Sequence, residues 1–393
     1  MKFSVLLPTR NRLELLRYAI ETVRRQDYDD WEIIVSDNAS EEDIAGHVRS
    51  LNDPRIRYYR TESFVPVTDN WNNALGKSTG DYVVMLGDDD CLMKGYFSTL
   101  RRLIEERGAP DLVYHSALLY AYPGVMPGFP DGFVQPYGYA GFLKNAREPF
   151  WLERATALQC VRDSMDFRVT FGFNMQFALV SRRLIDAMRD KGPFFQSPYP
   201  DYYAMNAALL KAERILVCPQ ALVTIGVSPK SFGYYYVNRA ERSGVEFLNN
   251  APDRDSFSRL EHVVLPGTEM NNSWLLAMET LRLKYGEEYA LKVNYGRYRL
   301  LQILQSCTAD DPRVSPPWAK LSFAEMCAAS AAWGLATVAG LLSGRLRRRV
   351  NAGLLVLAGA YPRYAPRRIV GRYRTILEVY EGRNEEFLGQ YAP

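Results

Sequence analysis

The stretch GDYVVMLGDDDCLMKG, from Gly80 to Gly95, places three consecutive aspartates directly behind a short apolar run. The run from Tyr82 to Leu86 has the length and the continuous apolar character of a strand that is buried on both faces. Asp88, Asp89 and Asp90 follow at the end of that strand. Adjacent like charges need either solvent or a cation, so the stretch predicts an acidic turn or a binding site.

The preceding residues predict an α/β fold. Phe3 to Leu7 and Trp31 to Asp37 are further apolar runs of strand length, and apolar residues recur at helical spacing from Leu13 to Val23. A strand, a helix and a strand within about 35 residues form a βαβ unit, whose strands are parallel. Ile56 to Tyr59 and Asn70 to Lys77 continue the alternation as strand and helix. We therefore expect a Rossmann-like, mainly parallel open sheet.

Polar residues follow three of these strands. Ligands bind such sheets outside the carboxyl ends of the strands, so residues that follow different strands meet along one edge. The segments expected at that edge are Pro8 to Asn11, Asp37 with Asn38, and Asp88 to Asp90.

The rest of the chain differs in character. The segment from Pro123 to Pro149 is rich in Gly, Pro and aromatic residues and predicts an irregular loop. Beyond about Asn238 the strand signals fade and helical patterns continue to the C-terminus. We expect an α/β domain over residues 1–240 and a mostly α-helical region over residues 241–393.

Composition excludes several classes of protein. The chain is 47% hydrophobic, which favours a packed core, and its net charge of only +3 gives no reason to expect nucleic-acid binding. The five cysteines contain no C-x-x-C pair, which argues against a disulfide framework and against a zinc site. The first residues lack the apolar region of a secretory signal, so we expect a cytoplasmic protein.

Four segments in order resemble glycosyltransferase family 2, the inverting nucleotide-sugar-dependent enzymes of the GT-A fold. They are SVLLPTRNR (4–12), WEIIVSDNASEED (31–43), DNWNNALGKSTGDYVVMLGDDD (69–90) and PDYYAMNAALLKAERILVCPQALV (200–223). The resemblance implies a GT-A catalytic domain that transfers a sugar from a nucleotide-diphosphate-sugar donor. It also implies an acceptor hydroxyl on a glycan or lipid-linked molecule, in the synthesis of a cell-surface polysaccharide.

The resemblance also implies a donor site at the predicted edge. Asp37 matches the aspartate that contacts the donor base, and a carboxylate can accept a hydrogen bond from a base N–H. Asp88 and Asp90 match the outer positions of a D-x-D motif, which holds Mg²⁺ or Mn²⁺. That register is open by one residue, because many members have an aspartate at the position of Gly87. The implied nucleotide-sugar contacts are Pro8, Thr9, Arg10, Asn11, Asp37, Asn38, Asn72, Asp88 and Asp89.

Asp201 matches the family's general base, which takes the proton of the acceptor hydroxyl in a single displacement. Pro200 stands where the family usually has a second acidic residue. An aspartate at a helix start can instead be a simple cap, and we expect the helix N-terminus to keep it ionised. Ser228 stands where many members carry a metal-ligating histidine, which leaves the aspartates as the main expected metal ligands.

The C-terminal region combines apolar and basic segments. Residues 326–342 carry no charge, and residues 343–377 contain nine arginines and no acidic residue. This pattern suits a helix on an anionic membrane surface, here the inner face of the cytoplasmic membrane. It equally suits a buried helical hairpin with a solvated basic face.

Two other functions stay open on the sequence. A sugar-nucleotide nucleotidyltransferase shares the α/β sheet and the metal, but it carries a Gly-rich loop after the first strand, where this chain has PTRNR. A non-catalytic nucleotide-sugar-binding protein would keep Asp37 and lose the base and the metal ligands. Loss of the histidine and of the second acidic residue points toward that alternative.

Overall fold

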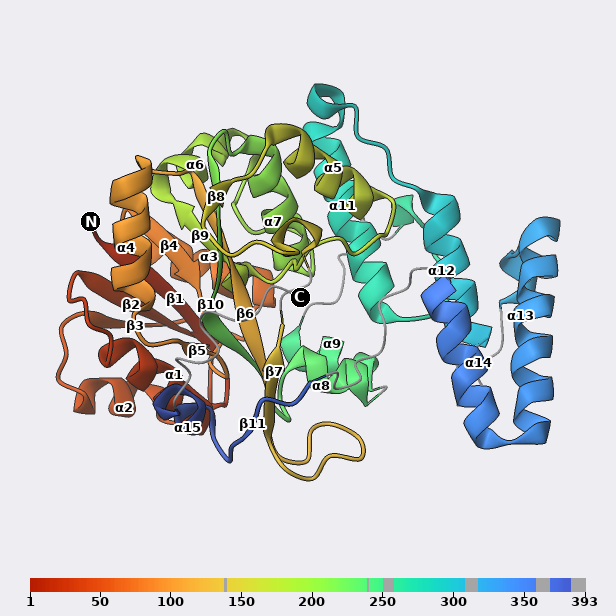
Figure 1. The fold of residues 1–393 in the computed structure, drawn as a ribbon, viewed down its shortest axis with the longest axis horizontal. Coiled ribbons are helices and arrows are strands. Elements are labelled where there is room, and N and C mark those ends of the chain that lie inside the picture. The colour runs from red at the N-terminus through yellow and green to blue at the C-terminus, as the bar shows by residue number, and fades with distance from the viewer. Residues whose placement is uncertain (138–139, 239, 250–257, 308–316, 358–367, 383–393) are drawn as a thin grey trace. The chain divides into compact units, whose positions relative to one another are not determined.

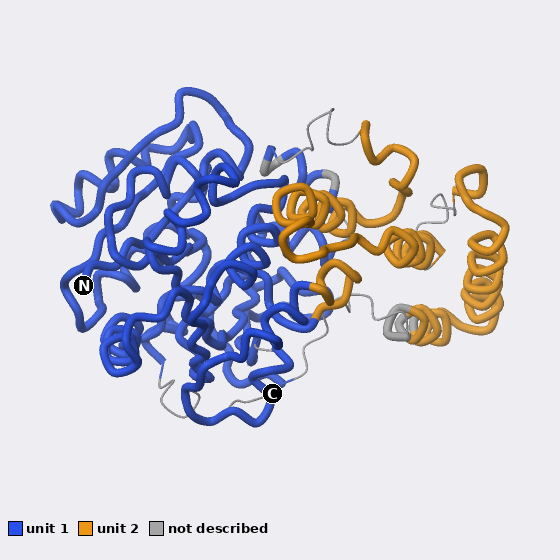
Figure 2. The backbone as a smooth tube through the Cα atoms, turned by 90° about the horizontal axis from the view of Figure 1, so that it is seen from above, with its two compact units in different colours: residues 1–161, 170–251, 366–393 blue, residues 162–169, 252–365 orange. Residues whose placement is uncertain are grey.

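The computed structural model describes residues 1–137, 140–238, 240–249, 258–307, 317–357 and 368–382. The chain folds into two compact units (Figure 2). The first comprises residues 1–161, 170–251 and 366–393, and the second comprises residues 162–169 and 252–365. A functional division of the chain near residue 240 stays a prediction.

The first unit is built on one eleven-stranded sheet (Figure 1). Its strands are β1 (Phe3–Thr9), β2 (Trp31–Asp37), β3 (Ile56–Arg60), β4 (Tyr82–Met85), β5 (Cys91–Leu92), β6 (Leu112–Ala121), β7 (Phe133–Pro136), β8 (Phe150–Trp151), β9 (Ala178–Ser181), β10 (Ile215–Val227) and β11 (Gly371–Arg372).

Helices connect these strands. They are α1 (Leu13–Arg24), α2 (Ile44–Ser50), α3 (Val67–Lys77), α4 (Tyr96–Arg107), η1 (Gly141–Leu143), η2 (Met175–Phe177), α6 (Arg182–Ala187), η3 (Arg189–Lys191), α7 (Pro200–Lys211), α8 (Phe232–Val237), α9 (Glu241–Leu248) and α15 (Ile376–Glu381). The helix α5 (Arg154–Met165) begins in the first unit and ends in the second.

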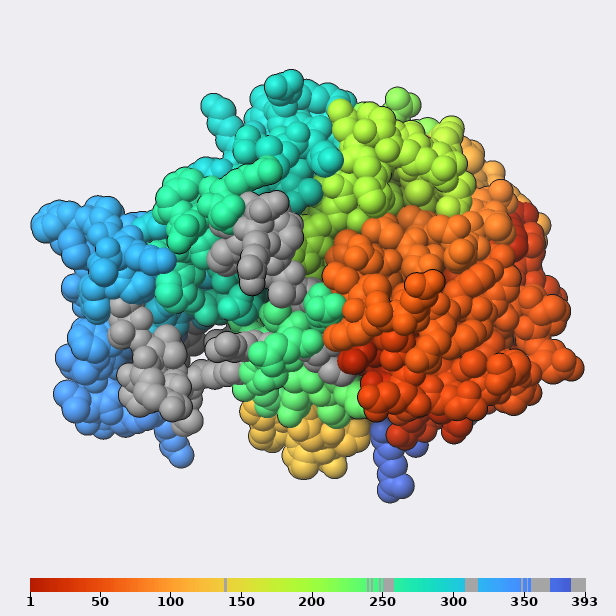
Figure 3. Space-filling view, turned by 180° about the vertical axis from the view of Figure 1, so that it is seen from behind, coloured from red at the N-terminus to blue at the C-terminus, as the bar shows by residue number. Residues whose placement is uncertain are grey.

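The strand order positions the polar strand ends. The main path is β11-β7-β6-β9-β4-β1-β2-β3, and β1 lies parallel to both β2 and β4. Thr9 pairs with Asp37 at the carboxyl ends of β1 and β2, and β4 ends just before the three aspartates. The predicted GT-A-type α/β class is confirmed, with β9 running antiparallel between β4 and β6. Figure 3 shows the continuous surface that the N-terminal part of this unit forms, in red and orange.

The segment predicted to be an irregular loop contains a strand. β7 pairs antiparallel with β6, and Phe133 and Val134 are buried there. The prediction was wrong at this point because Gly and Pro around the strand conceal a run of only four residues. Pro136 can end such a strand, since proline lacks the N–H that a sheet ladder needs.

The second unit is helical, as predicted. It contains α11 (Glu269–Tyr289), α12 (Tyr295–Cys307), η4 (Trp318–Lys320), α13 (Phe323–Leu342) and α14 (Gly344–Leu357). Phe167 contacts the rings of Trp274 and Tyr298 in its core. Within the described ranges, α13 is the one helix that is long and apolar enough to cross a membrane, by length and composition only.

Candidate active site

A cavity of about 280 Å³ lies at the carboxyl ends of the parallel strands in the first unit. Several loops that follow different strands contribute to its lining, as expected for an open α/β sheet. It brings together most of the predicted site residues: Pro8, Thr9, Arg10, Asn38, Asp88, Asp89, Asp90 and Asp201 all line it.

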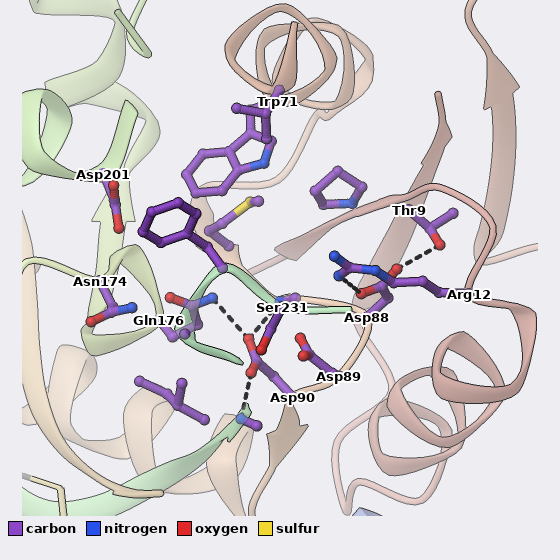
Figure 4. Close-up of a pocket in the computed structure, with 18 of the residues that line it drawn as sticks. Thr9, Arg12, Trp71, Asp88, Asp89, Asp90, Asn174, Gln176, Asp201 and Ser231 are labelled. Atoms are coloured by element: carbon purple, nitrogen blue, oxygen red, sulfur yellow. Dashed lines mark hydrogen bonds and ion pairs between the residues drawn. The ribbon is translucent and has the colours of Figure 1, made fainter. Parts of the chain in front are cut away.

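Asp88 is held by Thr9, the last residue of β1, and by Arg12, three residues further along the chain (Figure 4). One carboxylate oxygen accepts a hydrogen bond from the Thr9 hydroxyl at 2.7 Å, and the other pairs with the Arg12 guanidinium at 2.8 Å. Burial lowers the pKa of Arg12, but the charges of Asp88 and Asp89 outweigh burial and raise it. Arg12 is therefore a permanent positive charge within the cavity wall.

Asp90 is engaged by three donors. Its carboxylate accepts the backbone N–H of Gly87 at 2.7 Å, the backbone N–H of Gly226 at 2.8 Å and the side-chain amide of Gln176 at 2.8 Å. These donors come from the end of β4, from β10 and from η2, so Asp90 joins three segments. Burial, reinforced by the charge of Asp89, raises the pKa of Asp90 to about 7.

Asp89 contacts the residue that replaces the expected histidine. The Ser228 hydroxyl donates to the Asp89 carboxylate at 2.7 Å. Burial raises the pKa of Asp89, and the nearby Arg12 opposes that rise. Three carboxylates thus lie beside one paired guanidinium, and the raised pKa values of Asp89 and Asp90 favour their protonated forms while no further cation is bound. The described residues contain no group of three or more His, Cys, Asp or Glu side chains arranged to hold a metal ion.

Asp201 lies across the cavity from Asp88 and Arg12 (Figure 4). It is the second residue of α7, behind Pro200, and its carboxylate accepts the backbone N–H of Tyr202 at 3.0 Å. Burial nevertheless raises the pKa of Asp201 to about 7, and the backbone hydrogen bonds oppose the rise only in part. The expectation that the helix N-terminus keeps this group ionised is wrong in direction, because desolvation outweighs it.

Asp37, the predicted base contact, is fully buried at the end of β2. Its carboxylate accepts the Tyr58 hydroxyl at 2.6 Å and the backbone N–H of Ser40 at 2.9 Å. Asn38, the next residue, does line the cavity and is fixed by the backbone of Val65. At this strand end, Asn38 therefore lines the cavity, and Asp37 supports the loop.

The Asn11 side chain also contacts a neighbouring loop and does not line the cavity. Its side-chain oxygen accepts the backbone N–H of Glu41 at 2.7 Å, and its φ of 51° is left-handed, a conformation that asparagine tolerates better than most residues. Asn11 thereby joins the loops after β1 and β2, next to the lining residues Arg10 and Arg12.

Asn72 lies on a different face of α3 from the cavity. Val67, Asn70 and Trp71 line the cavity at helical spacing, whereas Asn72 exchanges two hydrogen bonds with the backbone of Phe195, at 2.8 and 3.2 Å. Those bonds fix the loop that leads into α7. Asn72 thus positions the segment that carries the predicted base.

Sequence reasoning missed several lining residues, among them Arg12, Trp71, Asn174 and Gln176. Arg12 and Trp71 fall inside segments that carried the resemblance, and the helical spacing from Val67 was the available signal for Trp71. Asn174 and Gln176 come from the short η2 segment, for which the sequence offered no motif.

The N-terminal part of the chain is similar in sequence to known glycosyltransferases. Residues 4–118 match the model of Glycosyl transferase family 2. A 108-residue segment is 41% identical to a GalNAc(5)-diNAcBac-PP-undecaprenol beta-1,3-glucosyltransferase of Campylobacter jejuni, covering 27% of this chain and 35% of that protein. A 154-residue segment is 38% identical to a putative colanic acid biosynthesis glycosyl transferase of Escherichia coli, covering 36% of this chain and 52% of that one. The chain thus spans about half or less of these relatives' lengths.

Some solved structures also have a partly similar backbone. Residues 1–349 of Staphylococcus aureus TarS match with a TM-score of 0.49 at 18% identity, covering 85% of this chain and 91% of that one. A mannosyltransferase from Pyrobaculum calidifontis, in complex with GDP-Man and Mn²⁺, matches with a TM-score of 0.42 at 14% identity, covering 91% and 85%. The matched sequence and its motifs make residues 4–118 of this chain similar to glycosyl transferase family 2.

Proposed function

We propose that this chain is an inverting glycosyltransferase that transfers a sugar from a nucleotide-diphosphate-sugar donor to a hydroxyl of a glycan or lipid-linked acceptor. One observation carries the proposal: Asp201 and the aspartate cluster line opposite sides of one cavity, and the cluster lies within the segment that matches family 2. The cavity volume of about 280 Å³ is that of a small-molecule site rather than of a packing defect.

Asp201 is the proposed general base. It takes the proton of the acceptor hydroxyl while the hydroxyl oxygen forms a bond to the anomeric carbon. The bond from that carbon to the diphosphate breaks in the same step, and the nucleoside diphosphate leaves with the electron pair. A carboxylate with a pKa near 7 suits proton abstraction at neutral pH.

The donor diphosphate is proposed to lie near Arg10 and Arg12. Arg12 carries a permanent charge, and Arg10 stacks on the Phe64 ring with its guanidinium carbon 3.6 Å from the ring centroid. Thr9 and Asn38, at the ends of β1 and β2, are the proposed contacts for the nucleoside. Both guanidinium groups suit anion recognition because their donors form a planar fork.

A divalent cation, Mg²⁺ or Mn²⁺, fits the donor set of the cluster. Its carboxylates supply oxygen ligands, which hard cations prefer. The predicted ligands were Asp88 and Asp90. Three donors engage Asp90, whereas two engage Asp88, so we propose that Asp88 and Asp89 hold the cation and that Asp90 has a positioning role. When bound, the cation would neutralise charge on the departing diphosphate.

The proposal also includes the acceptor and the cellular location. The Campylobacter relative is described as acting on an undecaprenol-linked glycan and the Escherichia relative as acting in colanic acid biosynthesis. We propose a lipid-linked acceptor in polysaccharide synthesis, reached from the cytoplasmic side at the inner face of the membrane. Trp71 and Asn174, near Asp201 in the cavity, are the proposed acceptor contacts.

A screen of nucleotide sugars by thermal shift tests the donor side, because a ligand that binds only the folded state raises Tm. A donor that stabilises the protein is then supplied with Mn²⁺, and release of the nucleoside diphosphate is measured for the wild type and for Asp201→Asn. Turnover by the wild type alone supports the proposal. Binding without turnover would instead identify a nucleotide-sugar-binding protein.

A further inference from the structure

The helix α13 packs with its small residues inward and its large apolar residues outward. Its buried side consists of alanines: Ala329, Ala332, Ala336 and Ala339. Its large apolar side chains are exposed, with Leu341 at 83%, Phe323 at 79% and Leu342 at 72%. A helix in a globular protein normally buries its largest apolar residues, so this pattern indicates a surface that meets another apolar phase.

The exposed large apolar residues are spread along α13, and we call them together the α13 outer face. At 3.6 residues per turn, Phe323, Val338 and Leu341 lie on the side of the helix opposite the buried alanines, and Leu335 and Leu342 lie between the two sides. The α13 outer face consists of Phe323, Leu335, Val338, Leu341 and Leu342. Trp333 flanks it, 47% exposed, and its ring meets that of Trp318 edge-on at 6.2 Å.

Positive charge lies at the C-terminal end of this face. α14 begins at Gly344, directly after α13, and it lies beside α13 in Figure 1. Its first turns carry the exposed side chains of Arg345 and Arg349. An apolar face, a flanking tryptophan pair and adjacent arginines are complementary to the acyl chains, the interface and the anionic headgroups of a bilayer.

Other contacts of α13 favour a helix that lies on the membrane over one that crosses it. Glu325, in its first turn, pairs with Arg299 of α12 at 2.7 Å, and Arg299 also donates to the backbone of Lys320. One side of the helix is thus covered by protein that carries charged groups. Among the described residues, the α13 outer face is the apolar side of this helix that is left for lipid, which is the arrangement of a monotopic interfacial helix.

We propose that the α13 outer face inserts into the headgroup region of an anionic bilayer, with Arg345 and Arg349 contacting the lipid phosphates. This surface would hold the protein at the membrane face proposed above, and in this respect it rests on the proposed function. Binding needs no donor and no acceptor, so it can be tested whether or not the proposed transfer reaction is confirmed.

Vesicle co-sedimentation of the full chain tests the proposal. The probes are vesicles of phosphatidylcholine alone and of equal parts phosphatidylcholine and phosphatidylglycerol. The wild type is expected to bind the anionic vesicles only. Val338→Glu with Leu341→Glu should abolish binding, and Arg345→Glu with Arg349→Glu should weaken it by about tenfold or more, since each near-surface charge contributes about 1 kcal/mol.

Matched controls lie on α11 of the same unit. Leu283→Glu changes an apolar residue that is 60% exposed, and Lys284→Glu reverses an exposed neighbouring charge. Both variants should bind as the wild type does. Equal losses in these controls, or no binding by the wild type, would overturn the proposal.

Cys327 supplies a second readout. Of the five cysteines, Cys91, Cys160, Cys218 and Cys307 are buried and Cys327 is exposed, so a thiol-reactive, polarity-sensitive dye labels α13 selectively. The dye emission should shift to the blue with anionic vesicles and stay unchanged with neutral ones. Retention in the membrane after alkaline carbonate would instead show a spanning helix. Concentration-dependent dimerisation that Val338→Glu abolishes, without vesicle binding, would assign the face to a second copy of the chain.

Discussion

The guanidinium of Arg12 and the carboxylate of Asp88 form an ion pair at 2.8 Å in the wall of the cavity, and both side chains are largely buried. Removal of one partner from a buried pair leaves an uncompensated charge, which costs about 3 kcal/mol or more. Arg12 therefore stabilises the aspartate cluster as well as offering positive charge to the donor.

Arg12→Gln should lower both stability and transfer. Asp88 would then lie unpaired beside Asp89, so we expect a loss of about 3 kcal/mol in the free energy of unfolding. Urea unfolding measures that loss. The double variant Arg12→Gln with Asp88→Asn should recover much of the stability but not the transfer activity. As a control, Arg102→Gln breaks an exposed pair with Glu106 and should change stability by less than about 0.5 kcal/mol.

Asp201→Asn should reduce transfer by about 10²- to 10⁴-fold, the usual contribution of a general base. In the wild type, kcat should rise with pH through about 7, because the base must be ionised to accept a proton. Asp69→Asn is the matched control, since Asp69 is also in the first turn of a helix but is exposed. A pH profile that is the same in wild type and Asp201→Asn would contradict the assignment.

Asp201→Asn is also expected to raise the stability of the protein at high pH. The folded pKa of Asp201 lies above its ordinary value, so the folded state binds the proton more tightly than the unfolded state. Stability from this group is therefore lost as pH rises from the unfolded pKa near 4 toward 7. Asp201→Asn should raise Tm relative to wild type at pH 8 and leave it nearly unchanged at pH 4. Thermal unfolding at the two pH values measures the difference.

Asp90→Ala separates a positioning role from a ligand role. Loss of the carboxylate leaves the N–H groups of Gly87 and Gly226 and the Gln176 amide without their acceptor, at about 1–3 kcal/mol for each buried group. We expect a clear drop in Tm together with loss of activity. Unchanged Tm with a raised Mn²⁺ requirement would show instead that Asp90 is a metal ligand.

Chelation tests the cation. EDTA should abolish transfer, and added Mn²⁺ or Mg²⁺ should restore it, because the cation proposed at Asp88 and Asp89 would neutralise charge on the departing diphosphate. Ser228→Ala removes the hydroxyl that fixes Asp89 and should raise the Mn²⁺ concentration needed for half-maximal rate several-fold. Full activity in EDTA would overturn the assignment of the cation.

The sequence predicted the strands and the polar edge well for a physical reason. β1, β2 and β4 are buried along their whole length, so each is a continuous apolar run that stands out without any tertiary information. Because parallel strands end at one edge, the segments after them could be placed together from spacing alone. Of these segments, Asp88 to Asp90 and Asn38 reached the cavity, whereas the side chains of Asp37 and Asn11 bond to neighbouring loops.

Other features depend on contacts between distant segments. No local pattern shows that Gln176 reaches Asp90, or that Asn72 bonds to the backbone of Phe195 instead of facing the cavity. The pKa of Asp201 is raised, whereas its position at a helix N-terminus predicted that it would stay ionised. Burial causes this difference, and burial is a property of the packed fold. In α13 the apolar sequence was visible, but only packing shows that the alanines lie inside and the leucines outside.

The anomer released from an α-linked nucleotide sugar tests the central claim most directly. In the absence of an acceptor, water takes the place of the hydroxyl, and proton NMR identifies the first anomer before mutarotation. Inverting transfer with Asp201 as base predicts the β anomer from the wild type and none from Asp201→Asn. Release of the α anomer first, or equal rates from the two proteins, would contradict the account.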